Sequence, residues 1–294
     1  MNSETSGDTS LVTSPDGMAI HCTHLRSQRN GGDGNLIVAL HGFTGDGSTM
    51  APLVEAVRGS RPAVLVDLIG HGHSQAPEHL EHYSMASVVD QVLSVVGIHE
   101  PGTVHLLGYS MGGRVALSMA ARAPWYFGSI TILSATAGIE DPVERAERHG
   151  ADLALADHLE HVGVADFVDE WLALELFEPF VTGLTPEELA ETKAQRGSST
   201  PHGLANSLRA TGTGAMPPLW SQLRSIRSPL LAIAGSRDAK YVDLAERVAG
   251  HAHDGRYEIV DAVGHVVHRE NLGGVSSIVE SFLKECDGHE DHQR

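Results

Sequence analysis

The clearest candidate for chemistry is a serine between glycines, in the run Gly108-Tyr109-Ser110-Met111-Gly112. A strand-like apolar run precedes it and a helix-like apolar run follows it, which is the setting of a G-x-S-x-G nucleophile elbow. The glycines let the turn approach its neighbours closely. The unpaired N–H groups at the start of the helix favour a developing oxyanion. The pattern predicts that Ser110 is a nucleophile or a base.

A serine in this role needs a histidine to accept its proton and an acid to orient that histidine. Asp238 and His265 each follow a late strand-like run, so both are expected at the same sheet edge as Ser110. Singly, the three read as a turn residue, a helix cap and a loop histidine; their joint order favours a triad. Asp243 and Asp261 are weaker alternatives, because Asp243 lies inside a predicted helix and Asp261 follows its strand too soon.

The expected chemistry also needs two hydrogen-bond donors for an oxyanion. One is the backbone N–H of Met111, directly after the serine, and the other is expected from Phe43, in the loop after an early strand. His41 in that loop is expected to brace it by hydrogen bonds rather than to catalyse. Thr44 and Ser48 are weaker candidates for additional hydroxyl donors.

Short apolar runs alternate with helix-like stretches along most of the chain. We expect a pair of short strands within 11–22, further strands at 35–40, 63–67, 104–107, 129–133, 229–235 and 257–260, and helices from 50, at 84–96, at 111–123, from 241 and at 275–284. Runs that are apolar throughout are typical of strands covered on both faces. The alternation predicts an α/β fold with a mostly parallel sheet and right-handed crossovers.

One segment breaks this rhythm. Residues 138–218 are rich in Ala, Glu, Leu and Asp with helical periodicity and have no strand-like run, so we expect an inserted helical cap. Thr185-Pro186-Glu187-Glu188 within it has the features of a helix start. Residues 1–137 and 219–294 are then the core domain, with 1–10 and 287–294 expected to be disordered.

Composition narrows the class of partner. The formal net charge is −18 and the chain has only three lysines, which argues against nucleic acid or an anionic membrane as a partner. The polar, acidic first eight residues do not resemble a secretory signal, and no apolar run reaches membrane-spanning length. The two cysteines, Cys22 and Cys286, do not resemble a disulfide framework. We expect a cytoplasmic protein, either a monomer or a small homo-oligomer.

The histidines do not form an evident metal motif. His158 and His161 are three residues apart, but a solvated helix explains that spacing better than a metal site. His71 and His73 lie in a glycine-rich turn, where a structural role is expected. No stretch of the sequence contains enough closely spaced ligands for a zinc site, and no dinucleotide-binding or P-loop glycine motif is present. The sequence therefore predicts neither a metal nor a cofactor.

Arginines select among the reactions that a Ser-His-Asp site performs. Arg114 falls one helical turn after Ser110, where a cation is costly unless it is paired or reaches a cavity. If it faces a pocket, it can hold a carboxylate in bidentate fashion. Arg145, Arg148 and Arg196 lie in the cap, where spacing alone favours surface pairing with nearby glutamates.

From about Leu36 to the last helix, the chain resembles the α/β-hydrolase superfamily. Within it, the chain is similar to the 2-succinyl-6-hydroxy-2,4-cyclohexadiene-1-carboxylate synthases, the lyases of menaquinone biosynthesis. The resemblance lies in the runs His41-Gly42-Phe43-Thr44-Gly45-Asp46, Val66-Asp67-Leu68-Ile69-Gly70-His71-Gly72, Gly108 to Ala116, Arg145-Ala146-Glu147-Arg148, Gly235-Ser236-Arg237-Asp238-Ala239-Lys240 and Gly264 to Asn271. The glycine and serine motifs are shared with many esterases, whereas the arginine-containing runs are more particular to the synthases.

The resemblance implies an α/β-hydrolase fold, with an eight-stranded type of sheet, and assigns roles to matching positions. These are a triad of Ser110, Asp238 and His265, backbone oxyanion donors at Phe43 and Met111, substrate-binding arginines at Arg114, Arg148 and Arg196, and aromatic pocket residues at Tyr109 and Trp171. The implied substrate is a small polycarboxylate, and the implied reaction eliminates pyruvate from it with Ser110 as the base. A carboxylesterase or carbon–carbon bond hydrolase of the same fold is the alternative enzyme, and a small-molecule receptor on a retained hydrolase fold is the non-enzymatic one.

Overall fold

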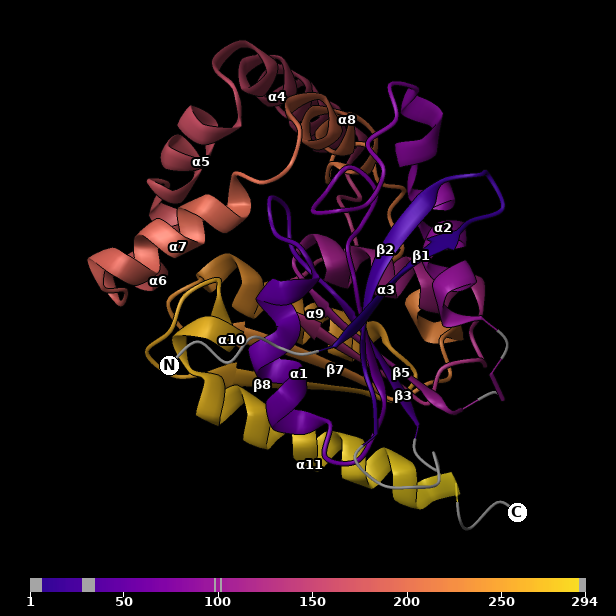
Figure 1. Ribbon diagram of the computed structural model, residues 1–294. Coiled ribbons are helices and arrows are strands. Elements are labelled where there is room, and N and C mark those ends of the chain that lie inside the picture. Colours follow the sequence, from indigo (N-terminus) through magenta and orange to yellow (C-terminus); the bar gives the residue numbers. More distant parts are fainter. Residues whose placement is uncertain (1–6, 28–34, 98, 101, 291–294) are drawn as a thin grey trace.

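An eight-stranded sheet forms the centre of the computed structural model, which describes residues 7–27, 35–97, 99–100 and 102–290 (Figure 1). Its strands are β1 (Asp8–Thr13), β2 (Ala19–Leu25), β3 (Leu36–Leu40), β4 (Ala63–Val66), β5 (Val104–Tyr109), β6 (Ser129–Leu133), β7 (Leu230–Gly235) and β8 (Gly255–Val260). They lie in the order β1-β2-β4-β3-β5-β6-β7-β8. All neighbours from β4 to β8 are parallel, and β1 and β2 add antiparallel strands at one edge. The predicted α/β class and mostly parallel sheet are confirmed.

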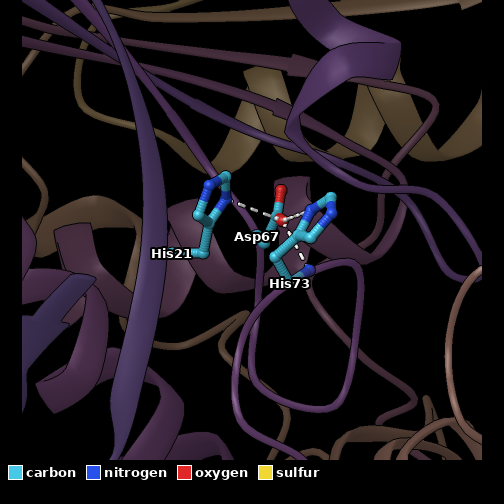
Figure 2. A group of neighbouring side chains, drawn as sticks. All are labelled: His21, Asp67 and His73. Atoms are coloured by element: carbon cyan, nitrogen blue, oxygen red, sulfur yellow. Dashed lines mark hydrogen bonds and ion pairs between the residues drawn. The ribbon is translucent and has the colours of Figure 1, made fainter. Parts of the chain in front are cut away.

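The antiparallel edge also brings distant residues together. The β2–β4 register continues past the end of β4, where the N–H of Asp67 donates to the carbonyl oxygen of His21 at 3.0 Å. The turn that follows β4 folds back toward the same place and carries His73. The side chains of His21, Asp67 and His73 therefore point toward one another (Figure 2).

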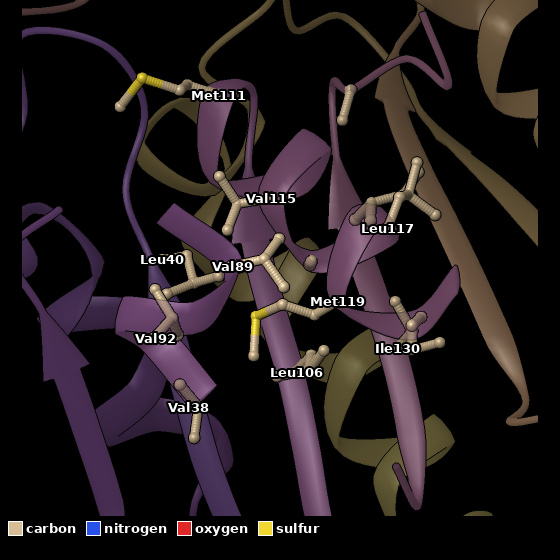
Figure 3. Packing of buried hydrophobic residues seen from close by; sticks show 14 of the residues in the cluster. Val38, Leu40, Val89, Val92, Leu106, Met111, Val115, Leu117, Met119 and Ile130 are labelled. Carbon is tan, nitrogen blue, oxygen red and sulfur yellow. The ribbon is translucent and has the colours of Figure 1, made fainter. Parts of the chain in front are cut away.

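Helices cover both faces of the sheet. They are α1 (Ala51–Val57), α2 (Met85–Val96), α3 (Met111–Arg122), α9 (Ala239–His251), α10 (Val267–Glu270) and α11 (Leu272–Glu290), with 3-10 turns η1 (Gly47–Met50), η2 (Leu80–Tyr83) and η4 (Leu223–Ser225). Helices α2, α3 and α9 pack on one face and α1 and α11 on the other, so successive residues of β3 serve different cores. Val38 and Leu40 face α2 and α3, whose Val89, Val92 and Met119 fill the space above the strands (Figure 3).

The cap region is helical. Between β6 and β7 lie α4 (Pro142–Val162), α5 (Val164–Leu172), η3 (Glu175–Phe177), α6 (Glu178–Thr182), α7 (Pro186–Arg196) and α8 (Pro201–Thr211). These helices lie over one end of the sheet (Figure 1). Helix α7 begins at the predicted place, where Thr185 and Glu188 form a reciprocal capping box. Within the described residues, no helix is long and apolar enough to cross a membrane.

The prediction of disordered ends is wrong where the chain is described. Residues 8–10 belong to β1, because all six residues of that strand pair with β2. Helix α11 continues past 287 instead of ending near 284. Asp287 holds it in place, with one carboxylate oxygen 2.8 Å from Nδ2 of Asn35 and 3.0 Å from Nε2 of His105, and the other bound to Arg61. Residues 1–6 and 291–294 lie outside the described part of the chain.

We expect Gly112→Ala to lower the free energy of unfolding by about 2–4 kcal/mol. A Cβ at this position would lie 2.2 Å from the carbonyl oxygen of Leu40 and 2.7 Å from that of His41, and backbone atoms cannot move aside cheaply. Urea denaturation measures the change. The matched control is Gly150→Ala in α4, where a Cβ meets nothing within 4 Å and stability should rise by about 0.5–1 kcal/mol. Equal effects of the two substitutions would contradict the packing argument.

Candidate active site

Ser110 occupies the sharp turn between β5 and α3. Its backbone has φ 50° and ψ −105°, a left-handed conformation that a non-glycine residue adopts only under constraint from its surroundings. The constraint is visible: the N–H of Ser110 donates to the carbonyl oxygen of Leu133 at 2.9 Å, and a Cβ on Gly108 would lie 2.4 Å from the carbonyl oxygen of Gly112. The turn therefore presents the Ser110 hydroxyl at the carboxyl edge of the sheet.

Ser110, His265 and Asp238 form one hydrogen-bonded chain. Oγ of Ser110 lies 3.2 Å from Nε2 of His265, and Nδ1 of His265 lies 2.8 Å from Oδ2 of Asp238. His265 and Asp238 are both buried. An ionised carboxylate can only accept a hydrogen bond, so Nδ1 of His265 carries the hydrogen. Nε2 is then free to accept the hydrogen bond of the serine hydroxyl. The structure thus brings the three predicted residues together, with the serine next to the histidine and the histidine next to the aspartate.

Asp238 also caps α9, because its other carboxylate oxygen accepts a hydrogen bond from the backbone N–H of Tyr241 at 3.4 Å. The helix-cap interpretation and the triad interpretation of this residue are therefore both compatible with its contacts. The alternative acids lie elsewhere: Asp261 accepts a hydrogen bond from the hydroxyl of Ser236, and Asp243 is exposed on α9.

The two predicted oxyanion donors lie beside Ser110. Within the described residues, the backbone N–H groups of Phe43 and Met111 donate no hydrogen bond. The loop of Phe43 packs directly on the elbow, since a Cβ on Gly42 would lie 2.6 Å from the Tyr109 ring and 3.6 Å from Cβ of Ser110. Both donors are consequently free to bind an oxygen atom next to the serine.

His41 fixes the shape of that loop, as predicted. Its Nδ1 donates to the carbonyl oxygen of Gly42 at 2.8 Å, and its Nε2 accepts the N–H of Leu68 at 3.0 Å. The hydroxyl of Thr44 accepts a hydrogen bond from Arg196 at 2.6 Å, and that of Ser48 donates to Asp46. These hydroxyls therefore support the loop rather than the proposed oxyanion position.

A cavity of about 250 Å³ opens beside Ser110, between the sheet edge and the cap. Nine of the ten predicted site residues contribute to its wall: Ser110, His265, Phe43, Met111, Arg114, Arg148, Arg196, Tyr109 and Trp171. The tenth, Asp238, reaches the cavity through His265. Residues from α3, α4, α5 and α7, from the end of β5 and from loops at the sheet edge thus converge on one space.

Two of the lining arginines are buried cations with only neutral partners. Arg114 donates to the carbonyl oxygen of Thr211, and Arg196 donates to the carbonyl oxygen of Phe43 and to the hydroxyl of Thr44. Neither forms an ion pair with a carboxylate within the described residues, and Nε of Arg196 has no hydrogen-bond partner there. Arginine stays protonated in proteins. Burial lowers the pKa of Arg114 to about 10 and also lowers the pKa of Arg196, as expected for charges removed from water. Buried cations of this kind favour an anionic ligand.

The third arginine is held differently. Nε of Arg148 lies 2.7 Å from Oδ1 of Asp152, whose side chain is only 2% exposed, while the arginine itself is half-buried. The other carboxylate oxygen of Asp152 accepts the N–H of Gly214 at 3.0 Å. The ion pair orients Arg148 toward the cavity. Arg145 instead donates to the carbonyl oxygens of Ile139 and Glu140, away from the lining residues.

Aromatic rings form the apolar part of the wall. Trp171 lies edge-on to Phe43 at 5.4 Å and stacks on Phe167 at 5.8 Å, and its buried Nε1 has no partner within the described residues. Tyr109 contacts the ring of His265 at 5.6 Å, and burial raises the pKa of its hydroxyl above the usual range. The cavity thus combines an apolar wall with cations at several points.

Sequence reasoning missed several polar residues of this wall, among them Tyr241, Lys240 and Asp152. The Tyr241 ring lies edge-on to His265 at 4.5 Å. Its position three residues after Asp238, in the first turn of a helix, is a signal that could have identified it. Asp152 is four residues after Arg148 on the same helix, a spacing that predicts an ion pair.

Buried neutral histidines near the site make stability depend on pH. Burial lowers the pKa of His71 from 6.5 to about 3, whereas the unfolded chain protonates this ring below about pH 6.5. Between these values the unfolded state binds more protons, so stability falls as the pH falls. We expect His71→Phe to lower the free energy of unfolding at pH 7. At pH 5 the difference in the free energy of unfolding between the variant and the unsubstituted protein should be smaller by about 2 kcal/mol, because the variant lacks this proton-linked loss. Urea denaturation across this pH range measures the gap; a constant gap would contradict the prediction.

Comparisons with known proteins agree with this fold. The family described as alpha/beta hydrolase fold matches residues 35–272. A Bacillus subtilis (strain 168) protein named putative 2-succinyl-6-hydroxy-2,4-cyclohexadiene-1-carboxylate synthase is 35% identical over 252 residues, which cover 84% of this chain and 89% of the relative. The Salmonella newport (strain SL254) synthase of that name is 28% identical over 267 residues, covering 91% and 100%.

Among solved structures, MenH from S. aureus superimposes with a TM-score of 0.83 at 30% sequence identity, covering 90% of this chain and 98% of that one. The resemblance predicted from the glycine, serine and arginine motifs is confirmed, as is the fold. The chain belongs to the α/β-hydrolase family and, within it, to the family of the 2-succinyl-6-hydroxy-2,4-cyclohexadiene-1-carboxylate synthases.

Proposed function

We propose that the protein is a lyase that eliminates pyruvate from 2-succinyl-5-enolpyruvyl-6-hydroxy-3-cyclohexene-1-carboxylate and yields 2-succinyl-6-hydroxy-2,4-cyclohexadiene-1-carboxylate. One observation carries the proposal: two buried guanidinium groups, of Arg114 and Arg196, line the cavity of Ser110 without a carboxylate partner among the described residues. An ordinary ester substrate does not compensate such charges, whereas a polycarboxylate does. The names of the relatives support the same reaction.

In this reaction Ser110 acts as a base. Its hydroxyl proton passes to Nε2 of His265, 3.2 Å away, while Oγ removes the ring proton next to the succinyl carbonyl. Asp238 stabilises the resulting imidazolium through its 2.8 Å contact with Nδ1. No acyl-enzyme forms, and the proton held by His265 leaves with the departing group or the solvent.

The released electron pair first moves onto the succinyl carbonyl oxygen. The N–H groups of Phe43 and Met111 would bind this enolate oxygen, a type of contact whose loss costs about 10²–10³-fold in rate. When the enolate collapses, the ring double bond shifts, a second ring double bond forms and the bond from the ring to the enolpyruvyl oxygen breaks. The leaving enol becomes pyruvate, so atoms and charge balance without an oxidant or a cofactor.

The three carboxylates of the substrate match the three arginines of the cavity. Arg114 and Arg196 offer buried guanidinium groups, and Arg148 offers one that Asp152 already orients. A desolvated arginine binds a carboxylate more strongly than an exposed one, and its planar fork also fixes the direction of the contact. The arginines would therefore orient the ring so that its acidic proton faces Ser110, even though the whole chain carries a net charge of −18.

The test incubates the purified protein with the enolpyruvyl substrate and measures the released pyruvate through a coupled reduction. We expect saturable release and little turnover of p-nitrophenyl acyl esters, with no burst of nitrophenol. Rapid ester turnover with a burst and no pyruvate release would overturn the lyase and favour a carboxylesterase of the same fold. Absence of both activities would favour a binding protein.

A further inference from the structure

His21, Asp67 and His73 bring three metal-ligating atoms together outside the active-site cavity (Figure 2). Nδ1 of His21 lies 3.0 Å and Nδ1 of His73 lies 3.6 Å from the same carboxylate oxygen, Oδ2 of Asp67. All three atoms lie within 4.8 Å of one another. Two ligands at about 2.0–2.1 Å from a tetrahedral zinc ion are about 3.3–3.4 Å apart. The two nitrogen–oxygen separations differ from this value by only a few tenths of an ångström, and the two imidazole nitrogens would move closer together as they bind the ion.

We propose that His21, Asp67 and His73 bind a divalent transition-metal ion of the zinc class, with its fourth position open to water. Imidazole nitrogen and carboxylate oxygen are ligands that such ions prefer. These ligands are separate from the residues proposed for the reaction above, because none of the three lines the cavity of Ser110.

The backbone around the cluster is held before any ion binds. The Ser74 hydroxyl accepts the N–H of His21 at 2.8 Å and donates to the carbonyl oxygen of Asp67 at 2.5 Å, so one side chain ties β2 and the turn to the end of β4. The turn is also wrapped tightly around the carboxylate: a Cβ on Gly72 would lie 2.4 Å from Oδ2 of Asp67. A preorganised cluster of this kind loses little freedom when it binds an ion.

The charge of the cluster also favours a cation. The Asp67 side chain is only 5% exposed, and its contacts are the imidazoles and the backbone N–H groups of Gly47, at 2.7 Å, and His73, at 2.9 Å. Within the described residues, no lysine or arginine pairs with it. A buried carboxylate without a cationic partner is stabilised by a metal ion.

Each of the three side chains can bind the ion after only a local change. The His73 side chain is 78% exposed and can turn toward the cluster without repacking. His21 now contacts Asp67 through Nδ1; on binding, its proton moves from Nδ1 to Nε2, so the ring stays neutral and Nδ1 becomes a ligand. Oδ2 of Asp67 exchanges the contact with His21 for the ion, while Oδ1 keeps its bond to Gly47.

The ion would act as a brace for the oxyanion loop. Asp67 holds Gly47 at the end of that loop, and His71 in the same turn contacts the rings of His41 at 5.1 Å and Phe43 at 5.8 Å. An ion that binds only the folded chain stabilises it by mass action. Zinc should therefore raise the melting temperature of the metal-free protein.

The experiment titrates the full-length, tag-free, metal-free protein with Zn²⁺ in competition with a chromophoric chelator, and repeats the titration with Co²⁺ to record the visible spectrum. We expect one ion per chain, a higher melting temperature with Zn²⁺, and the intense bands of tetrahedral Co²⁺. His73→Ala, which removes an exposed side chain, and His21→Ala should each weaken binding by about tenfold or more. His253→Ala, at an exposed histidine outside the cluster, should leave the affinity unchanged.

Three results would overturn the proposal. The first is that no one-to-one complex with the ion forms, and the second is that His73→Ala leaves the affinity for the ion unchanged. The third is that His253→Ala weakens the affinity as much as His73→Ala does, which would mean that scattered surface histidines bind the ion. Melting of each variant without metal reports its folding, and His73→Ala decides the question even if His21→Ala fails to fold. Pyruvate release is measured separately, so failure of the metal site and failure of the proposed lyase remain distinguishable.

Discussion

Ser110→Ala is expected to lower kcat for pyruvate release by about 10³-fold or more while leaving the melting temperature nearly unchanged. The substitution removes Oγ, the atom that is proposed to take the substrate proton and to pass its own proton to Nε2 of His265, 3.2 Å away. The fold should tolerate the change because the Ser110 side chain does not cap α3. Steady-state kinetics and thermal denaturation measure the two effects.

Ser118→Ala is the matched control. It lies two turns further along the same helix, and among the described residues its hydroxyl donates only to the carbonyl oxygen of Arg114, at 2.8 Å. Its removal should therefore leave kcat within about twofold. A mass spectrum of the unsubstituted protein under turnover should show no covalent adduct. Retention of activity in Ser110→Ala would exclude the serine as the base, and an adduct on Ser110 would favour acyl transfer instead.

Arg114→Met is expected to lower kcat/KM by about 10²–10³-fold without lowering the melting temperature. Methionine fills a similar apolar volume but removes a buried charge that has only the carbonyl oxygen of Thr211 as a described partner. Replacement of an uncompensated buried charge by an apolar side chain is neutral or stabilising. The expected opposition between activity and stability separates a substrate-binding arginine from a structural one.

Arg122→Met, at the last residue of the same helix, provides the control for charge and helix propensity. Its side chain is 52% exposed and pairs with Asp90, so both kcat/KM and stability should change little. A small tricarboxylate should raise the melting temperature of the unsubstituted protein and of Arg122→Met, but not of Arg114→Met. A large drop in the stability of Arg114→Met with unchanged kcat/KM would show that the arginine serves the fold alone.

Local patterns in the sequence predicted most of the elements. The apolar run before Ser110 and the helix after it could be read from residues two to four positions apart, and the structure confirms β5 and α3 there. The ends were harder. Strand β1 begins three residues before the predicted strand pair, at Asp8, because it pairs with β2 along its whole length, and the last turns of α11 are held by partners distant in sequence. Asp287, for example, is held by Asn35 and His105, whose positions no local pattern reveals.

By itself, the sequence determined the elbow at Ser110, the order of Ser110, Asp238 and His265, and the helical character of the cap, because each depends on residue types at short spacing. The tertiary structure alone decided that Arg114 and Arg196 face the same cavity and that Arg148 is oriented by Asp152. It also decided that His21 meets a carboxylate 46 positions away. The physical reason is the same in each case: burial, charge pairing and ligand convergence depend on how the crossovers and the cap pack, and chain spacing does not encode that directly.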